Sequence, residues 1–188
     1  YVEATTNCAA ATGKEGMIKL IAAASVSSFF FGLFGVSWKS VDGKIEREFP
    51  SVQTVSTDVL LMRYEAADAK LPIIIDVREI GEFRVSHLDG ALHLESAEAI
   101  FDVIAERGLS KDTEIILYCS VGYRSASVAA DLKERGFTQV LNLEHSLFEW
   151  ANKGYPMTSA SGRTDKVHPF NKAWSVLVDE ALHGYPDK

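Results

Sequence analysis

The stretch EIILYCSVGYRS, residues 114–125, decides both the fold class and the candidate chemistry. Residues 114–119 form a nearly continuous apolar run, which predicts a strand buried on both faces of a sheet. The following residues contain Gly122 and predict a tight loop, and residues 125–136 predict a helix. In open α/β sheets, ligands bind beyond the carboxyl ends of the strands, so Cys119 is expected at a functional edge.

The same alternation of strand and helix extends on both sides of this stretch. Strands are expected at residues 52–56, 71–77, 91–94 and 139–143, and helices at residues 56–70, 79–86, 97–108 and 146–154. Strands that are apolar throughout and that alternate with helices predict an α/β fold with a central parallel sheet flanked by helices. The predicted domain runs from residue 50 to residue 158.

Two flanking regions complete the predicted organisation. Residues 1–49 are expected to form a polar tail, an N-terminal apolar helix and a charged connector. Residues 159–188 are expected to form a C-terminal tail that starts as a loop and ends in a short helix within NKAWSVLVDEALHG, residues 171–184.

The apolar segment of residues 18–38 is a candidate for membrane anchoring. Leu20 to Trp38 has about the length that spans a bilayer, although serines and glycines dilute its hydropathy. A signal peptide or membrane anchor, with Met17 as a candidate start, is favoured over a soluble amphipathic or buried helix. A membrane-anchored or exported location is therefore expected rather than a cytoplasmic one.

The composition excludes several function classes. The formal net charge of −7 argues against general nucleic-acid binding, which needs a basic face. The chain has two cysteines, Cys8 and Cys119, which are too few for a disulfide framework or a zinc site. An acidic protein that binds an anion must build its positive potential locally, from backbone amides and one or two arginines.

The loop after Cys119 has the features of such a local anion site. A loop between a buried strand and a helix N-terminus points successive N–H groups at one place, and these dipoles stabilise a thiolate. Gly122 permits the tight backbone, and Arg124 supplies a cation for an anionic substrate. The alternative is that Cys119 is a small buried residue that ends a strand. The nucleophile interpretation requires its side chain to be reachable and the neighbouring amides to point at it.

Three motifs resemble the single-domain rhodanese family. Residues 76–91 are similar to its D-x-R-x-x-x-E-F-x-x-G-H-I-x-G-A stretch, and residues 119–125 to its active-site loop. Residues 150–156 are similar to the W-x-x-x-G-x-P close of the domain. The resemblance covers about residues 50–158, with the motifs in the correct order and spacing.

The resemblance implies a sulfurtransferase that moves a sulfane sulfur from thiosulfate or a similar donor to a thiol or cyanide acceptor. The sulfur would be carried on Cys119 as a persulfide. The substrate-binding residues would be those of the loop, namely Ser120, Val121, Gly122, Tyr123, Arg124 and Ser125. No metal and no cofactor are implied, and the partners would be a small anionic sulfur donor and a thiol or protein acceptor.

The remaining motif residues are expected to support the site. The resemblance implies that Asp76 and Arg78 brace the sheet through buried pairing, and that Glu82 contributes to the same support. His87 is more consistent with a packed residue at a turn than with a general base.

Two positions depart from the family pattern. Ser86 stands where the family usually has glycine, and His145-Ser146 replace a frequent Gly-Gly pair. If those glycines take positive φ angles, the substitutions imply a local rearrangement. His145 and Ser146 could also change the choice of acceptor.

Two other functions remain open. A cysteine phosphatase shares the fold, but its loop has five residues between cysteine and arginine, whereas four separate Cys119 from Arg124. A catalytically weak sulfur carrier or docking module is the alternative from another functional class. The donor, the acceptor and the oligomeric state do not follow from the sequence.

Overall fold

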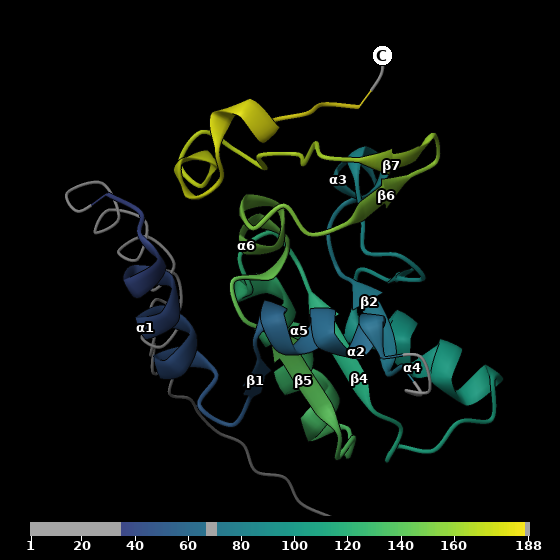
Figure 1. Cartoon of the computed structure of the whole chain (residues 1–188). Coiled ribbons are helices and arrows are strands. Elements are labelled where there is room, and N and C mark those ends of the chain that lie inside the picture. The colour runs from purple at the N-terminus through teal and green to yellow at the C-terminus, as the bar shows by residue number, and fades with distance from the viewer. Residues whose placement is uncertain (1–34, 67–70, 187–188) are drawn as a thin grey trace, which may run out of the picture. The chain divides into compact units, whose positions relative to one another are not determined.

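A five-stranded parallel sheet forms the centre of the structure, a computed structural model that describes residues 35–66 and 71–186 (Figure 1). Its strand order is β1-β5-β4-β2-β3, and every pairing is parallel. The strands are β1 (Gln53–Val55), β2 (Ile73–Asp76), β3 (Leu92–His93), β4 (Ile115–Tyr118) and β5 (Val140–Leu143). The α/β fold with a central parallel sheet is thus confirmed.

Strand β4 lies in the middle of the sheet, and all four of its side chains are fully buried. Alternate side chains point to opposite faces of a strand. Ile116 and Tyr118 therefore join one apolar cluster, while Ile115 and Leu117 join the other. Because a buried aliphatic side chain stabilises the fold by about 1.5–3 kcal/mol, this strand fixes the position of the loop that follows it.

Helices cover both faces of the sheet. Ile100 of α4 and Ala129 of α5 pack in one cluster, whereas Leu60 of α2 and Phe148 of α6 pack in the other. The helices are α1 (Trp38–Glu48), α2 (Thr57–Glu65), α3 (Ile80–Val85), α4 (Ala97–Glu106), α5 (Tyr123–Glu134) and α6 (Ser146–Asn152).

Helix α1 occupies residues that the charge pattern predicts as a connector, so that expectation was wrong. Ser37 accepts a hydrogen bond from the Ser40 amide, and the Ser40 side chain accepts one from the Ser37 amide, which closes the first turn. Val41 and Ile45 are four residues apart and both are buried against the core. The helix has a narrow apolar stripe in an otherwise charged stretch.

The chain after α6 differs from the predicted tail. Strands β6 (Met157–Ser159) and β7 (Gly162–Thr164) form an antiparallel hairpin where a loop was expected. The short helix predicted within residues 171–184 is present only as two separate 3₁₀ helices, η2 (Ser175–Leu177) and η3 (Glu180–Leu182). Extended backbone at Val178 separates them.

The N-terminal apolar segment lies almost entirely outside the described residues. Its predicted helix and membrane anchoring, assigned to residues 18–38, therefore stay predictions. Among residues 35–66 and 71–186, no helix has the length and apolar character needed to cross a membrane.

Candidate active site

The loop from Cys119 to Gly122 connects β4 to α5 and holds the Cys119 sulfur at the start of the helix. Gly122 is the residue that caps α5, and its φ of 98° lies in the left-handed region that favours glycine. The Gly122 amide donates a hydrogen bond to Cys119 Sγ over 3.2 Å. The Asn142 side-chain amide donates to the Gly122 carbonyl over 3.1 Å, which holds the turn in place. The expected orientation of a loop amide toward the sulfur is present.

The backbone of Cys119 is held from the side of α6. The Cys119 amide donates to Ser146 Oγ over 3.2 Å, and the Ser146 hydroxyl donates to the Leu143 carbonyl over 2.9 Å. The carbonyls of Cys119 and Ser120 accept bonds from the Leu147 and Phe148 amides. Ser146 is therefore part of the support of the loop, a role that the sequence did not predict.

The Cys119 thiol is buried, with an exposed fraction of 0%. Burial raises the pKa of this thiol, but the positive charge of Arg124 and hydrogen bonds from Ser125 and Val121 outweigh it, so the pKa lies below its ordinary value. The expectation of a stabilised thiolate fits this geometry. The expectation of a reachable side chain does not, because neighbouring groups cover Sγ on every side.

Arg124 is one of the covering groups, and neighbouring side chains hold its guanidinium in place. Its guanidinium donates to both carboxylate oxygens of Glu82, each over 2.8 Å, and to Ser120 Oγ over 3.0 Å. The Ser120 hydroxyl in turn donates to Glu82 over 2.8 Å. Burial raises the pKa of Glu82, but the hydrogen bonds from Arg124 and Ser120 outweigh burial and bring the pKa below its ordinary value. The carboxylate therefore stays ionised. Arg124 is thereby fixed beside the thiolate.

Replacing Arg124 with alanine is expected to move the pH profile of Cys119 alkylation to higher pH. The variant removes the positive charge that lowers the pKa of Cys119, so the thiolate is disfavoured. The rate of reaction with iodoacetamide, measured against pH, gives the midpoint. The matched control is Arg84→Ala, because Arg84 is an exposed arginine on α3. Identical profiles for the Arg124 variant and the native protein would contradict the electrostatic role of Arg124.

Two other loop residues face structural neighbours. Val121 is buried in the main apolar cluster. The Tyr123 hydroxyl bonds with Lys44 and Glu48 of α1, and its ring lies 5.5 Å from that of Phe49. Tyr123 therefore packs against α1 in this structure, and its expected contribution to substrate binding stays a prediction.

Asp76 and Arg78 form an ion pair whose side chains are both fully buried. Arg78 Nη2 lies 2.6 Å from Asp76 Oδ2 and also donates to the Ser86 carbonyl over 2.6 Å. The His87 ring stacks on Phe83 at 3.9 Å between centroids, and its Nδ1 lies 2.9 Å from the Phe83 carbonyl oxygen. These contacts fit the supporting roles expected for all three motif residues.

The departures from the family pattern have different consequences. Ser86 has a φ of −165°, which is extended backbone that any residue adopts. His145 and Ser146 have φ angles of 53° and 48°, so both take the left-handed conformation without being glycine. The His145 ring lies between Asp42 and Glu149, with nitrogen–oxygen distances of 3.0 and 3.1 Å. These contacts explain how the strained turn is held.

His145 is expected to make stability depend on pH. Burial lowers its pKa, but hydrogen bonds with Glu149 and Asp42 outweigh burial and raise it above the ordinary value. The raised pKa means that protonated His145 stabilises the fold below the unfolded pKa, and that this stabilisation is lost as the pH rises through the folded pKa. His145→Asn removes the charge while tolerating the left-handed backbone.

Urea unfolding of native protein and His145→Asn tests this linkage. The variant should lose on the order of 1 kcal/mol at about pH 6 and less at about pH 9. A difference in unfolding free energy that is the same at both pH values would show that the contacts of His145 do not depend on its charge.

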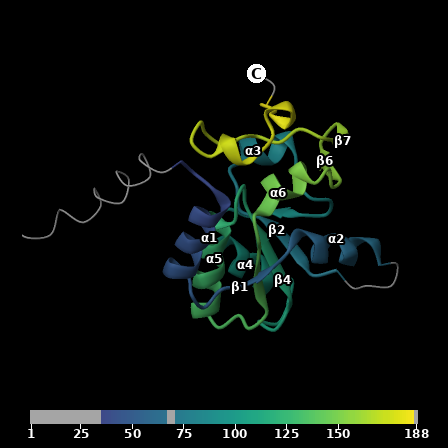
Figure 2. The same cartoon turned by 60° about the vertical axis from the view of Figure 1, so that its left-hand side comes forward.

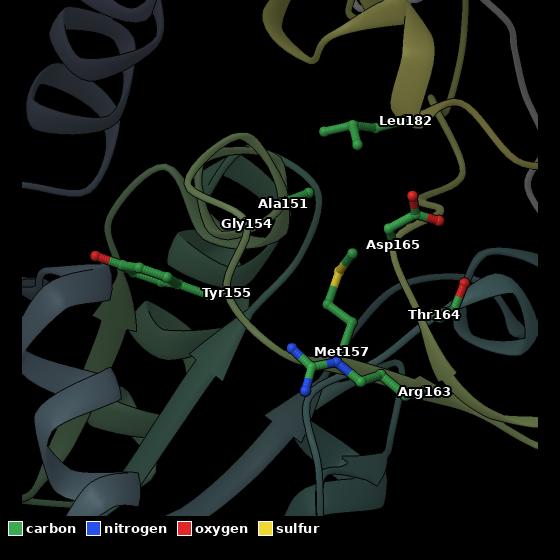
Figure 3. A pocket seen from close by; sticks show the side chains of 8 residues that line it. All are labelled: Ala151, Gly154, Tyr155, Met157, Arg163, Thr164, Asp165 and Leu182. Atoms are coloured by element: carbon green, nitrogen blue, oxygen red, sulfur yellow. The ribbon is translucent and has the colours of Figure 1, made fainter.

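Two hollows of the described structure lie away from Cys119. One, of about 380 Å³, is bordered by the end of α6, the β6–β7 hairpin and the following chain, with the Met157 side chain reaching into it (Figure 3). The other, of about 260 Å³, lies between α1 and β5 and includes Asn142 and His145. Neither contains a residue of the 119–125 loop. Within the described ranges, no group of three or more His, Cys, Asp or Glu is placed to hold a metal ion.

Comparison with known proteins points to sulfur chemistry. Residues 57–153 match the rhodanese-like domain family. The chain is 29% identical over 96 residues to a sulfurtransferase of Allochromatium vinosum, a match that covers 51% of this chain and 87% of that protein. It is 33% identical over 82 residues to YrkF of Bacillus subtilis, a proposed sulfur carrier protein, over 43% of this chain. That match spans 42% of YrkF, so less than half of this relative has a counterpart here.

A solved structure shares the fold. The thiosulfate sulfurtransferase of Pseudomonas aeruginosa is similar, with a TM-score of 0.54 at 18% identity, over 74% of this chain and 26% of that one. At this level of identity the likeness concerns the arrangement of strands and helices.

Proposed function

Because the chain belongs to the rhodanese-like domain family, we propose that it is a sulfurtransferase that carries a sulfane sulfur on Cys119 as a persulfide. The observation that carries the proposal is the Gly122 amide, which points at Cys119 Sγ from the start of α5. A thiolate in such a place is a stabilised nucleophile. The relatives from A. vinosum and B. subtilis, a sulfurtransferase and a proposed sulfur carrier, support a role in moving sulfur.

The first proposed step loads the sulfur. The Cys119 thiolate attacks the outer sulfur of a donor such as thiosulfate, and a bond forms between Sγ and that sulfur. The sulfur–sulfur bond of thiosulfate breaks, and its electron pair leaves with sulfite. One thiolate and one thiosulfate dianion thus give one persulfide anion and one sulfite dianion. The loop amides and Arg124 stabilise the negative charge during this exchange.

The second proposed step unloads the sulfur. An acceptor attacks the outer persulfide sulfur, and the bond between that sulfur and Cys119 Sγ breaks. Cyanide becomes thiocyanate and a thiol becomes a persulfide, while the electron pair of the broken bond regenerates the Cys119 thiolate. Splitting the transfer into two displacements is the advantage of covalent catalysis.

Mass spectrometry of the thiosulfate-treated protein tests the persulfide. After removal of small molecules, the peptide that contains Cys119 should carry the mass of one added sulfur atom, and cyanide should remove it. The peptide that contains Cys8 provides the internal control. An unmodified Cys119, or equal addition to both cysteines, would exclude Cys119 as the specific carrier.

A sulfur carrier or docking module with little turnover is the second candidate. The observations that favour it are the full burial of Cys119 and the occupation of Arg124 by Glu82. The enzyme and the sulfur carrier both predict a persulfide, but they differ in catalysis. Steady-state thiocyanate production over many turnovers supports the enzyme, whereas a single loading that only a particular partner protein can discharge supports the carrier.

A further inference from the structure

A segment outside the family match crosses the end of the sheet where the Cys119 loop lies. We name residues 165–186 the C-terminal strap. Figures 1 and 2 both show it, in yellow, beyond the carboxyl ends of the strands and beside α3 and α6. The family match ends at residue 153, so the strap is a feature of this chain beyond the matched domain.

The strap is held at several points. Val167 is fully buried, and its amide and carbonyl bond with the Leu182 carbonyl and the Gly184 amide. The Asn152 side chain of α6 donates to the Leu177 carbonyl and accepts from the Asp179 amide, each over 2.9 Å. The strap is thus fixed at Val167 and at Leu177, and the turn between these two residues faces the active-site loop.

The turn places an aromatic ring on the active-site arginine. The Phe170 ring centroid lies 4.5 Å from the Arg124 guanidinium carbon, a cation–π contact. Phe170 has a φ of 62°, a strained conformation for a bulky residue. The His168 Nδ1 atom accepts a hydrogen bond from the Phe170 amide over 3.1 Å, so Nδ1 must carry no proton. Burial lowers the pKa of His168, in keeping with that requirement. Strained backbone that its surroundings hold in place is found at functional sites, which makes Phe170 a candidate for a functional role.

A layered cover results over the sulfur. Arg124 interacts with the Cys119 sulfur, and Phe170 lies on the guanidinium of Arg124. The backbone that carries the sulfur is fixed by β4, α5 and Ser146, so moving it would break hydrogen bonds and buried contacts. Arg124 and Phe170 both retain exposed surface, and the Phe170 ring can move without breaking a hydrogen bond of its own. Access to the sulfur therefore depends on these two side chains.

We propose that Phe170 is a specificity-determining residue, which admits small sulfur anions to Cys119 and restricts bulky sulfur compounds. This inference rests on the proposed function for its substrate class, but its effect on access does not require sulfur transfer. A small anion reaches Sγ after a small displacement of Arg124. A bulky donor such as glutathione persulfide reaches Sγ only when the Phe170 ring has also left the guanidinium.

The test compares small and bulky reagents on the whole chain in a Cys8→Ser background. Phe170→Gly removes the ring and also suits the positive φ, so the strap backbone is not strained by the change. Val176→Ala is the matched control, because Val176 is an exposed apolar residue of the same strap. Phe170→Leu, which keeps an apolar side chain without the aromatic face, is the second variant. Thermal unfolding checks that each variant is folded.

Alkylation rates give the decisive readout. Phe170→Gly should speed the reaction of fluorescein maleimide with Cys119 about ten-fold, and that of iodoacetamide about two-fold or less. The kcat/KM for glutathione persulfide should rise relative to that for thiosulfate in the same variant. Val176→Ala should leave both ratios unchanged.

The result that overturns the inference is an unchanged ratio of bulky to small alkylation rates in folded Phe170→Gly and Phe170→Leu. Failure of the proposed function has a different signature. In that case no donor yields a persulfide in any variant, while the alkylation ratio still changes when Phe170 is replaced.

Discussion

Cys119→Ser is expected to lower sulfur transfer from thiosulfate to cyanide by about 10³-fold or more. A serine hydroxyl is not ionised at neutral pH and cannot carry a sulfane sulfur, so both proposed steps are lost. The change is nearly isosteric and the position is fully buried beside Gly122, so the fold should tolerate it. Thiocyanate production under steady-state conditions measures the loss.

Cys8→Ser is the matched control for this loss, because Cys8 is the other cysteine of the chain. It should transfer sulfur at the native rate. Retention of a tenth or more of the native activity by Cys119→Ser would mean that another group carries the sulfur, and the persulfide proposal would then be wrong.

The second large effect concerns stability. Arg78→Met should lower the free energy of unfolding by about 3–5 kcal/mol, because it leaves the fully buried carboxylate of Asp76 without its partner. The carboxyl end of β2 also loses the bond from Arg78 to the Ser86 carbonyl. Urea unfolding, followed by circular dichroism, measures the change.

A surface pair and a double variant give the controls. Arg63→Met breaks a partly exposed ion pair with Glu114 and should cost about 1 kcal/mol or less. Adding Asp76→Leu to Arg78→Met removes the unpaired charge, so it should recover part of the lost stability. A cost for Arg78→Met as small as that of the surface variant would show that the buried pair does not brace the sheet.

Most of the fold could be predicted because its strands and helices differ in pattern along the chain. The apolar run of residues 114–119 and the alternation around it predict a parallel sheet, and the rhodanese resemblance drawn from three motifs is confirmed by the family match. Helix α1 was missed because two buried residues, Val41 and Ile45, carry its packing. The predicted tail helix is divided into two 3₁₀ helices because Leu177 and Val178 are buried through tertiary contacts and Val178 is extended.

The sequence predicted less of the site, for a different reason. A loop amide near Cys119 follows from local geometry, since strand, turn and helix are contiguous. The pairing of Arg124 with Glu82 joins residues 42 positions apart, and the ring of Phe170 comes from a separate segment. Neither contact has a periodic or local signal. The loop amide that points at Cys119 could thus be predicted, whereas the groups that cover Cys119 could not.

Helix α1 and the C-terminal strap also bear on where an expression boundary belongs. Both lie outside residues 57–153, yet Val41 and Leu177 are part of the main apolar cluster. A fragment trimmed to the matched residues would expose the parts of the main apolar cluster that α1 and the C-terminal strap cover. It would also remove the contact between His145 and Asp42. Exposed apolar surfaces favour aggregation. Recombinant fragments should therefore begin no later than Ser37 and end no earlier than Gly184, where the last backbone bond of the strap is made.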